Sequence, residues 1–78
     1  MTIGEHMKKA RESKGLSMSK LGELAGVHKQ TIYAAESNRA YTSILNVICL
    51  ADALKISIDE YIGRKVLNYA EGDNFVRK

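Results

Sequence analysis

The most informative segment of the chain is SMSKLGELAGVHKQTIYAAE, residues 17–36. Within this segment, apolar residues recur at helical spacing before and after AGVH, residues 25–28. These four residues leave room for no more than a tight turn between two helices. Glycine adopts the backbone conformations that such a turn requires without a steric penalty. Two helices joined by so short a turn are typical of a helix-turn-helix motif. We expect Val27 and Ile32 to pack the second helix of the pair onto Leu21 and Ala25.

Helical spacing extends over most of the chain, and no sustained alternation typical of strands is present. A capping box of Thr2 and Glu5 opens the first helix, and a glycine suited to a left-handed cap ends it. The expected helices run from Thr2 to Gly15, from Ser17 to Ala25, from His28 to Glu36, from Ser43 to Leu54 and from Ser57 to Gly63. The sequence therefore predicts a compact all-α domain of five helices over residues 1–63, with a short C-terminal tail over residues 64–78.

The core is predicted from apolar residues that recur three and four positions apart. Charged residues, Arg11 among them, are assigned to the remaining faces of the first helix. The expected core positions are Ile3, Met7 and Ala10, then Leu21, Leu24 and Ala25, then Ile44, Val47, Ile48, Ala51 and Leu54, and finally Ile58, Tyr61 and Ile62.

Length and charge narrow the classes of function. A chain of 78 residues is a single small domain, much shorter than the ~200 residues of barrel enzymes. Its 12 Lys and Arg residues exceed its 9 Asp and Glu residues by three. Residues 1–39 hold seven of the bases and four of the acids, so the whole excess lies in the first half. A basic half indicates a polyanionic partner such as nucleic acid, and an ordinary solvated surface is the alternative.

The chain lacks the residue patterns that disulfides, metal sites, phosphate-binding loops and membrane spans require. Cys49 is the only cysteine, so neither a disulfide within the chain nor a cysteine-rich zinc site is predicted. His6 and His28 are not spaced as metal ligands, and no glycine-rich phosphate loop is present. The most apolar run, residues 44–54, is far shorter than a membrane span. We expect a protein of the reducing cytoplasm that needs no membrane, metal or cofactor and is not an enzyme.

The helix after the turn has two distinct sides. At ~100° per residue, Ile32 and Ala35 fall on the inner side together with His28. Glutamine pairs with adenine, and lysine with guanine, in the major groove, mainly from the N-terminal part of a recognition helix. The alternative is an ordinary solvated face. The outer side, which we predict to contact bases, carries Lys29, Gln30, Tyr33 and Ala34.

The chain resembles the Cro/repressor-type (XRE-like, lambda-repressor-like) helix-turn-helix domains of phage and bacterial regulators over residues 3–62. The matching residues, in order, are Gly15-Leu16-Ser17, Leu21, Ala25-Gly26-Val27, Thr31-Ile32, Glu36, Leu50-Ala51, Ala53-Leu54 and Ile56-Ser57-Ile58-Asp59-Glu60. This resemblance implies a five-helix fold whose third helix enters the major groove of double-stranded DNA. We therefore expect a sequence-specific transcriptional regulator, such as a repressor, that binds a pseudo-palindromic operator as a homodimer.

Contacts to the DNA backbone are expected around the start of the second helix and after the third, where family members touch phosphates. A helix N-terminus presents unpaired N–H groups suited to an anion. Met18 stands where the family usually has glutamine, and His28 where it usually has serine or threonine. Histidine caps helices poorly, but it can donate to a phosphate. The expected backbone-contacting residues are Ser17, Met18, His28, Thr31, Asn38, Arg39 and Thr42.

An apolar patch is predicted at Leu45 and Cys49, where family members usually carry polar residues, together with the nearby Tyr41. Either the tail covers this patch through Val66, Leu67, Tyr69, Phe75 and Val76, or a second subunit does, and a plain exposed patch is the least favoured alternative. Two alternative functions follow. One is a restriction–modification controller protein, which these residues would fit equally well. The other is an antitoxin or protein-interaction module, in which the patch holds a protein partner and DNA binding is secondary.

Overall fold

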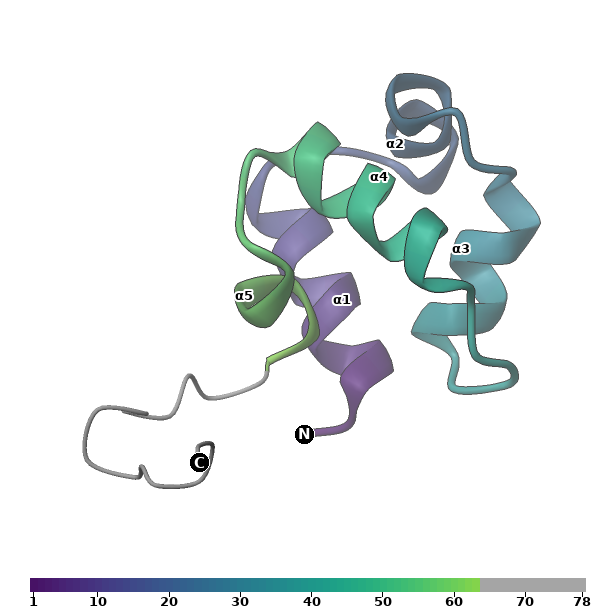
Figure 1. The fold of residues 1–78 in the computed structure, drawn as a ribbon, viewed down its shortest axis with the longest axis vertical. Helices are drawn as coiled ribbons and strands as arrows, with labels where there is room; N and C mark the ends of the chain where they lie inside the picture. The colour runs from purple at the N-terminus through teal and green to yellow at the C-terminus, as the bar shows by residue number, and fades with distance from the viewer. Residues whose placement is uncertain (64–78) are drawn as a thin grey trace, which may run out of the picture.

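The computed structural model describes residues 1–63 (Figure 1). These residues form helices and no strand, as the sequence predicted. The helices are α1 (Ile3–Ser13), α2 (Met18–Ala25), α3 (Lys29–Glu36), α4 (Ile44–Leu54) and α5 (Ile58–Ile62). The expected cover of the apolar patch by the tail concerns residues 64–78, which lie outside the described part.

The helices begin where the sequence places them because a polar side chain precedes each one. That side chain accepts a hydrogen bond from a backbone N–H of the first turn, a group with no partner inside the helix. The capping residues are Thr2, Ser17, His28, Ser43 and Ser57. Gly26 then ends α2 in the left-handed conformation, with φ of 72°, and its N–H donates to the Gly22 carbonyl oxygen at 2.8 Å. The glycine turn of the helix-turn-helix is thus confirmed.

The five helices pack around one core. Helix α1 contacts α3 and α5, whereas α2 contacts α3 and α4, and α4 also contacts α5. Figure 1 shows α4 in the middle of the view, with α2 and α3 on one side and α5 on the other. The buried hydrophobic residues are Met7, Leu21, Val27, Ile32, Ala35, Leu50, Ala51, Leu54 and Tyr61. The expected packing of Val27 and Ile32 with Leu21 is therefore present.

Three expected core residues are largely exposed. The side chain of Ile44 is 63% exposed, and those of Ile3 and Leu24 are each about half exposed. Leu50, which the apolar spacing did not single out, is fully buried. The core face of α4 is therefore turned toward Leu50, Ala51 and Leu54. The prediction for Ile44 was wrong because helical periodicity groups residues on one side but does not say how far the neighbouring helices extend along it.

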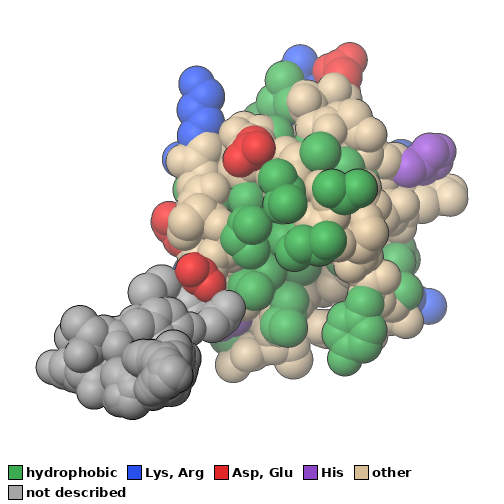
Figure 2. Space-filling view, in the orientation of Figure 1, with side chains coloured by type: hydrophobic (Ala, Val, Ile, Leu, Met, Phe, Trp, Pro, Cys, Tyr) green, Lys and Arg blue, Asp and Glu red, His purple; other side chains and the backbone are tan. Residues whose placement is uncertain are grey.

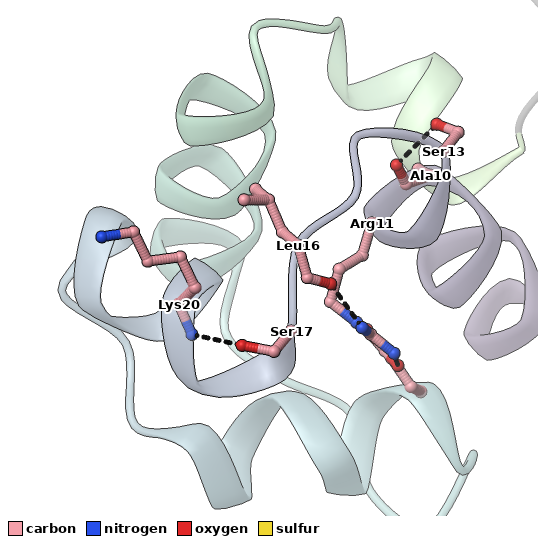
Figure 3. A network of polar contacts seen from close by, with 7 residues as sticks. Ala10, Arg11, Ser13, Leu16, Ser17 and Lys20 are labelled. Carbon is pink, nitrogen blue, oxygen red and sulfur yellow. Dashed lines mark hydrogen bonds and ion pairs between the residues drawn. The ribbon is translucent and has the colours of Figure 1, made fainter.

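Arg11 is buried, although the sequence placed it outside the apolar stripe of the first helix. Its guanidinium makes a bidentate contact with the Glu36 carboxylate, from Nε at 2.8 Å and from Nη2 at 3.0 Å. Its Nη1 donates to the Leu16 carbonyl oxygen at 2.7 Å (Figure 3). The hydrogen bonds to Glu36 raise the pKa of Arg11. Because both charges are hydrogen-bonded, the pair ties α1 to the end of α3 without leaving an unpaired buried charge.

The start of α1 also packs against the end of α3. Asn38 has φ of 61°, a left-handed conformation that asparagine tolerates better than most residues. Its Oδ1 accepts from the Gly4 N–H at 3.1 Å, and its Nδ2 donates to Thr2 Oγ1 at 2.9 Å. A Cβ atom on Gly4 would lie 2.7 Å from the Ala35 carbonyl oxygen. This close approach fixes the segment that follows α3.

Candidate nucleic-acid interface

The inner and outer sides of α3 are separated as the sequence predicted. Ile32 is fully buried and Ala35 nearly so. On the opposite side Lys29 and Gln30 are exposed and Tyr33 is 47% exposed, while Ala34 is partly buried. We call Lys29, Gln30, Tyr33 and Ala34 the outer row. It combines an ammonium, an amide, a phenol and a methyl group, all of which have partners on base edges in the major groove.

Arg39 lies against the outer row. Its guanidinium carbon is 5.7 Å from the centroid of the Tyr33 ring, which is the geometry of a cation–π contact. The backbone brings it there, because the Arg39 N–H donates to the Ala34 carbonyl oxygen at 2.9 Å. The structure thus joins a residue expected to contact phosphates with a residue expected to contact bases. No sequence pattern predicts this contact, because the chain reverses direction between Tyr33 and Arg39.

His28 caps α3 even though histidine is an unusual capping residue. Its Nδ1 accepts from the Gln30 N–H at 3.5 Å, the long end of hydrogen-bonding distance. An Nδ1 that accepts leaves the ring proton on Nε2, and the ring itself is exposed. The ring is thus exposed and not on the buried side of Ile32 and Ala35, with which helical spacing grouped it, and a contact from its side chain to an anion would come from Nε2.

The start of α2 keeps the expected anion-binding geometry in part. Ser17 Oγ accepts from the Lys20 N–H at 3.0 Å. The Met18 side chain packs against the core, so a contact from Met18 to DNA would have to come from its backbone N–H. The Lys20 ammonium lies 3.1 Å from the Glu23 carboxylate, which offsets its charge.

The segment after α3 holds three of the expected backbone-contacting residues. Arg39 is exposed, whereas the Asn38 carboxamide is bonded to Thr2 and Gly4. Thr42 Oγ1 accepts from Asn46 Nδ2 at 3.0 Å. Thr31, on α3 itself, is partly buried.

An apolar surface lies beside α4. Tyr41 is 97% exposed, Leu45 is 70% exposed, and Cys49 is exposed as well. Ile44, which the sequence assigned to the core, belongs to the same surface. We call Tyr41, Ile44, Leu45 and Cys49 the α4 face. Figure 2 shows hydrophobic side chains gathered over the middle of the molecule, where Figure 1 places α4.

A groove of about 360 Å³ borders the α4 face. Its walls come from α1, the end of α3, the α3–α4 connection, α4 and α5, and most of the lining residues are apolar. Ile3 and Ile44 line the groove and are also exposed to solvent. Ile44 and Leu45 are adjacent, so their side chains lie about 100° apart around α4, and both are exposed. Adjacency alone does not predict this, because the neighbours Leu50 and Ala51 are both buried in the same helix.

Within residues 1–63, no cluster of three His, Cys, Asp or Glu side chains could hold a metal ion. Over the same residues, no helix has both the length and the apolar character that a membrane span requires.

Comparison with known proteins identifies the fold. The helix-turn-helix family model matches residues 7–61. A solved structure, described as the restriction-modification controller protein C.AhdI from Aeromonas hydrophila, is 30% identical, with a TM-score of 0.73. The match covers 76% of this chain and 86% of that one. No curated protein sequence matches the chain significantly. The chain therefore belongs to the XRE-like helix-turn-helix family of DNA-binding transcriptional regulators.

Proposed function

We propose that the protein is a sequence-specific regulator that places α3 in the major groove of its operator. One observation carries this proposal: α3 buries Ile32 and Ala35 against its neighbours and exposes Lys29, Gln30 and Tyr33 of the outer row to solvent. A helix that is held rigidly by its inner side can present its outer side to base edges without a large loss of entropy on binding.

Each residue of the outer row has a role that follows from its chemistry. Lys29 donates to guanine O6 or N7, and Gln30 pairs with the N6 and N7 groups of adenine. Tyr33 contacts a base edge through its ring or hydroxyl. Ala34 contacts a thymine methyl group.

Contacts to phosphate fix the position of α3 but do not read sequence. We assign them to Ser17 and Met18 at the start of α2, to His28 and Thr31 at the start of α3, and to Arg39 and Thr42 after α3. Asn38 was expected to join them. Because its carboxamide is bonded to α1, we propose that Asn38 contributes by holding Arg39 in place.

We further propose that two copies pair through the α4 face and bind a pseudo-palindromic site. The exposed apolar side chains of Tyr41, Ile44 and Leu45 lose contact with water when a second copy covers them. A two-fold contact uses the same patch on both copies, which requires a self-complementary surface of this kind. The half-site centres should then lie ~34 Å apart. We place this activity in the cytoplasm, as the single cysteine suggests.

Selection of bound sites from random duplex DNA tests this function. The proposal predicts an enriched inverted repeat whose affinity falls steeply as salt is raised, because bound phosphates release counterions. The same selection with a Gln30→Ala variant should lose preference at one position in each half-site. Absence of any enriched motif at low ionic strength would contradict sequence-specific binding.

A restriction–modification controller protein is a second candidate, favoured by the similarity to C.AhdI. This role is a special case of the proposed function. The test is whether genes for a restriction endonuclease and a methyltransferase lie beside the gene for this protein, and whether the enriched motif occurs upstream of them. Absence of both would remove this candidate and leave the general function standing.

A further inference from the structure

The segment after α3 is unusually well fixed for a connecting loop. Asn38 adopts a left-handed conformation and bonds to Gly4 and Thr2 of the neighbouring helix terminus. The N–H groups of Arg39 and Ala40 then both donate to the Ala34 carbonyl oxygen, at 2.9 and 3.4 Å. The backbone of Arg39 is therefore held against the C-terminal end of α3 before any DNA binds.

This backbone geometry places the Arg39 guanidinium over the Tyr33 ring, 5.7 Å from its centroid. Both side chains are exposed, so the contact is not forced by burial in the core. A guanidinium stacks through its flat face, which leaves the N–H groups at its edge able to donate to another acceptor. Arg39 can therefore bind a phosphate and hold Tyr33 at the same time.

A tyrosine on the outside of a helix otherwise samples several side-chain rotamers. Binding DNA would require it to settle in one of them, at a cost in entropy. A guanidinium on one side of the ring lowers that cost, because Tyr33 is already restrained. It also leaves only the ring edge, the hydroxyl and the opposite face for contact with a base.

We propose that Arg39 is a positioning residue for Tyr33, through which a backbone-contacting side chain takes part in base selection. This inference rests on the proposed function, because it assigns Tyr33 to base contact. It departs from the simple expectation for an arginine that contacts phosphate, whose removal weakens all DNA sequences equally.

The first test uses the enriched operator and its single-base variants. Arg39→Ala should lower discrimination about two- to fivefold at one position, as expected for an exposed cation–π contact. Tyr33→Leu should change preference at the same position, and the double variant should lose no more discrimination than Tyr33→Leu alone. Arg39→Lys keeps the charge but not the flat stack, so it should retain most of the salt dependence and lose discrimination. Lys9→Ala, which removes an exposed charge from α1, should leave base preference intact.

The second test needs no DNA. The δ protons of Arg39 should show an upfield ring-current shift in the NMR spectrum, and this shift should disappear in Tyr33→Leu. The thermal midpoints of Tyr33→Leu and Arg39→Ala should differ little from that of the unmodified protein. If Arg39→Ala weakens every sequence by one factor, or if the Arg39 resonances are the same in Tyr33→Leu, the inference is wrong and the proposed function stands. If the unmodified protein selects no motif at all, the proposed function itself fails.

Discussion

Gln30 shows how a single side chain could carry sequence information. It is exposed in the first turn of α3, and its backbone N–H donates a hydrogen bond to His28 Nδ1. The amide therefore extends from a backbone that is already held in place. An amide offers a donor and an acceptor side by side, which matches adenine in the major groove and no other base equally well.

We predict that Gln30→Ala weakens binding to the enriched operator by about 1–3 kcal/mol and relaxes preference at one base pair. Fluorescence anisotropy on the operator and on its single-base variants measures both quantities. Lys8→Ala serves as the control, since an exposed lysine on α1 should affect all sequences alike. Weaker binding with an unchanged order of preference would show that Gln30 does not read a base.

Gly4 is a second position at which one atom matters. A Cβ atom there would meet the Glu36 carbonyl oxygen and would lie 2.8 Å from Asn38 Oδ1. Gly4→Ala should therefore lower the free energy of unfolding by about 1–3 kcal/mol through overpacking, although alanine is the better helix former. Urea denaturation followed by circular dichroism measures the change. Lys9→Ala, on the exposed side of α1, should change it little, and equal effects of the two substitutions would refute the steric argument.

At the scale of the helices, the Arg11–Glu36 pair links α1 and α3 through buried charges, whereas Lys20 and Glu23 form an exposed pair within α2. Glu36→Ala leaves the Arg11 charge buried without its partner. It should lower the free energy of unfolding by about 3–5 kcal/mol, enough to unfold much of a small domain. Glu23→Ala breaks the exposed pair and should cost less than about 1 kcal/mol.

The same urea experiment compares these two variants. The double substitution of Arg11→Met with Glu36→Leu should recover part of the stability, because it removes both charges from the core. A Glu36→Ala protein as stable as Glu23→Ala would mean that the buried pair contributes nothing.

Helix α5 is anchored by Tyr61, whose hydroxyl is buried with no hydrogen-bond partner among residues 1–63. Burial raises the pKa of Tyr61 in the folded state. An unfolded tyrosine ionises at about pH 10. Between that pH and the higher pKa of folded Tyr61, the unfolded state holds fewer protons than the folded state. The contribution of Tyr61 to stability is thus fully present below that window and is lost as pH rises through it.

Tyr61→Phe should accordingly match or exceed the stability of the unmodified protein at neutral pH, by up to about 1 kcal/mol. It should also reduce the loss of stability above about pH 10. Thermal unfolding across that pH range measures both effects. Tyr33→Phe, which removes the hydroxyl of an exposed tyrosine, is the matched control and should leave the stability at neutral pH unchanged. A destabilised Tyr61→Phe protein would show that the hydroxyl has a partner after all.

At the scale of the whole molecule, the two surfaces proposed for function differ in character. The outer row and its surroundings are polar and basic, whereas the α4 face is apolar and borders an apolar groove. The first suits DNA and the second suits a protein surface. A dimer through the α4 face would present two copies of α3 to one duplex.

We predict that Leu45→Lys prevents dimer formation while the isolated domain remains folded, because Leu45 is already 70% exposed. Sedimentation over a range of concentrations should show a dimer for the unmodified protein and a monomer for the variant. Binding to a full operator should weaken far more than binding to a half-site. Leu24→Lys, at another exposed leucine on α2, should leave the dimer intact in sedimentation. An unmodified protein that is monomeric both alone and on its operator would contradict the proposed pairing.

Local signals in the sequence were sufficient to predict the five helices, the glycine turn and the two sides of α3. Each depends on residues within about four positions of one another: a capping side chain and the N–H groups of the next turn, or apolar residues one turn apart. The exposed patch at Leu45 and Cys49 was predicted on a different ground, because related domains usually carry polar residues at those positions.

Only the tertiary structure decided which residues meet across the chain. Arg11 and Glu36 are separated by 25 residues, and Gly4 and Asn38 by 34, so no local pattern links them. The burial of Arg11 and the exposure of Ile44 depend on where neighbouring helices begin and end. The contact of Arg39 with Tyr33 depends on a reversal of the backbone at Asn38. Periodicity assigns a residue to a side of its helix, but what lies opposite that side is set by packing between segments that are remote in the sequence.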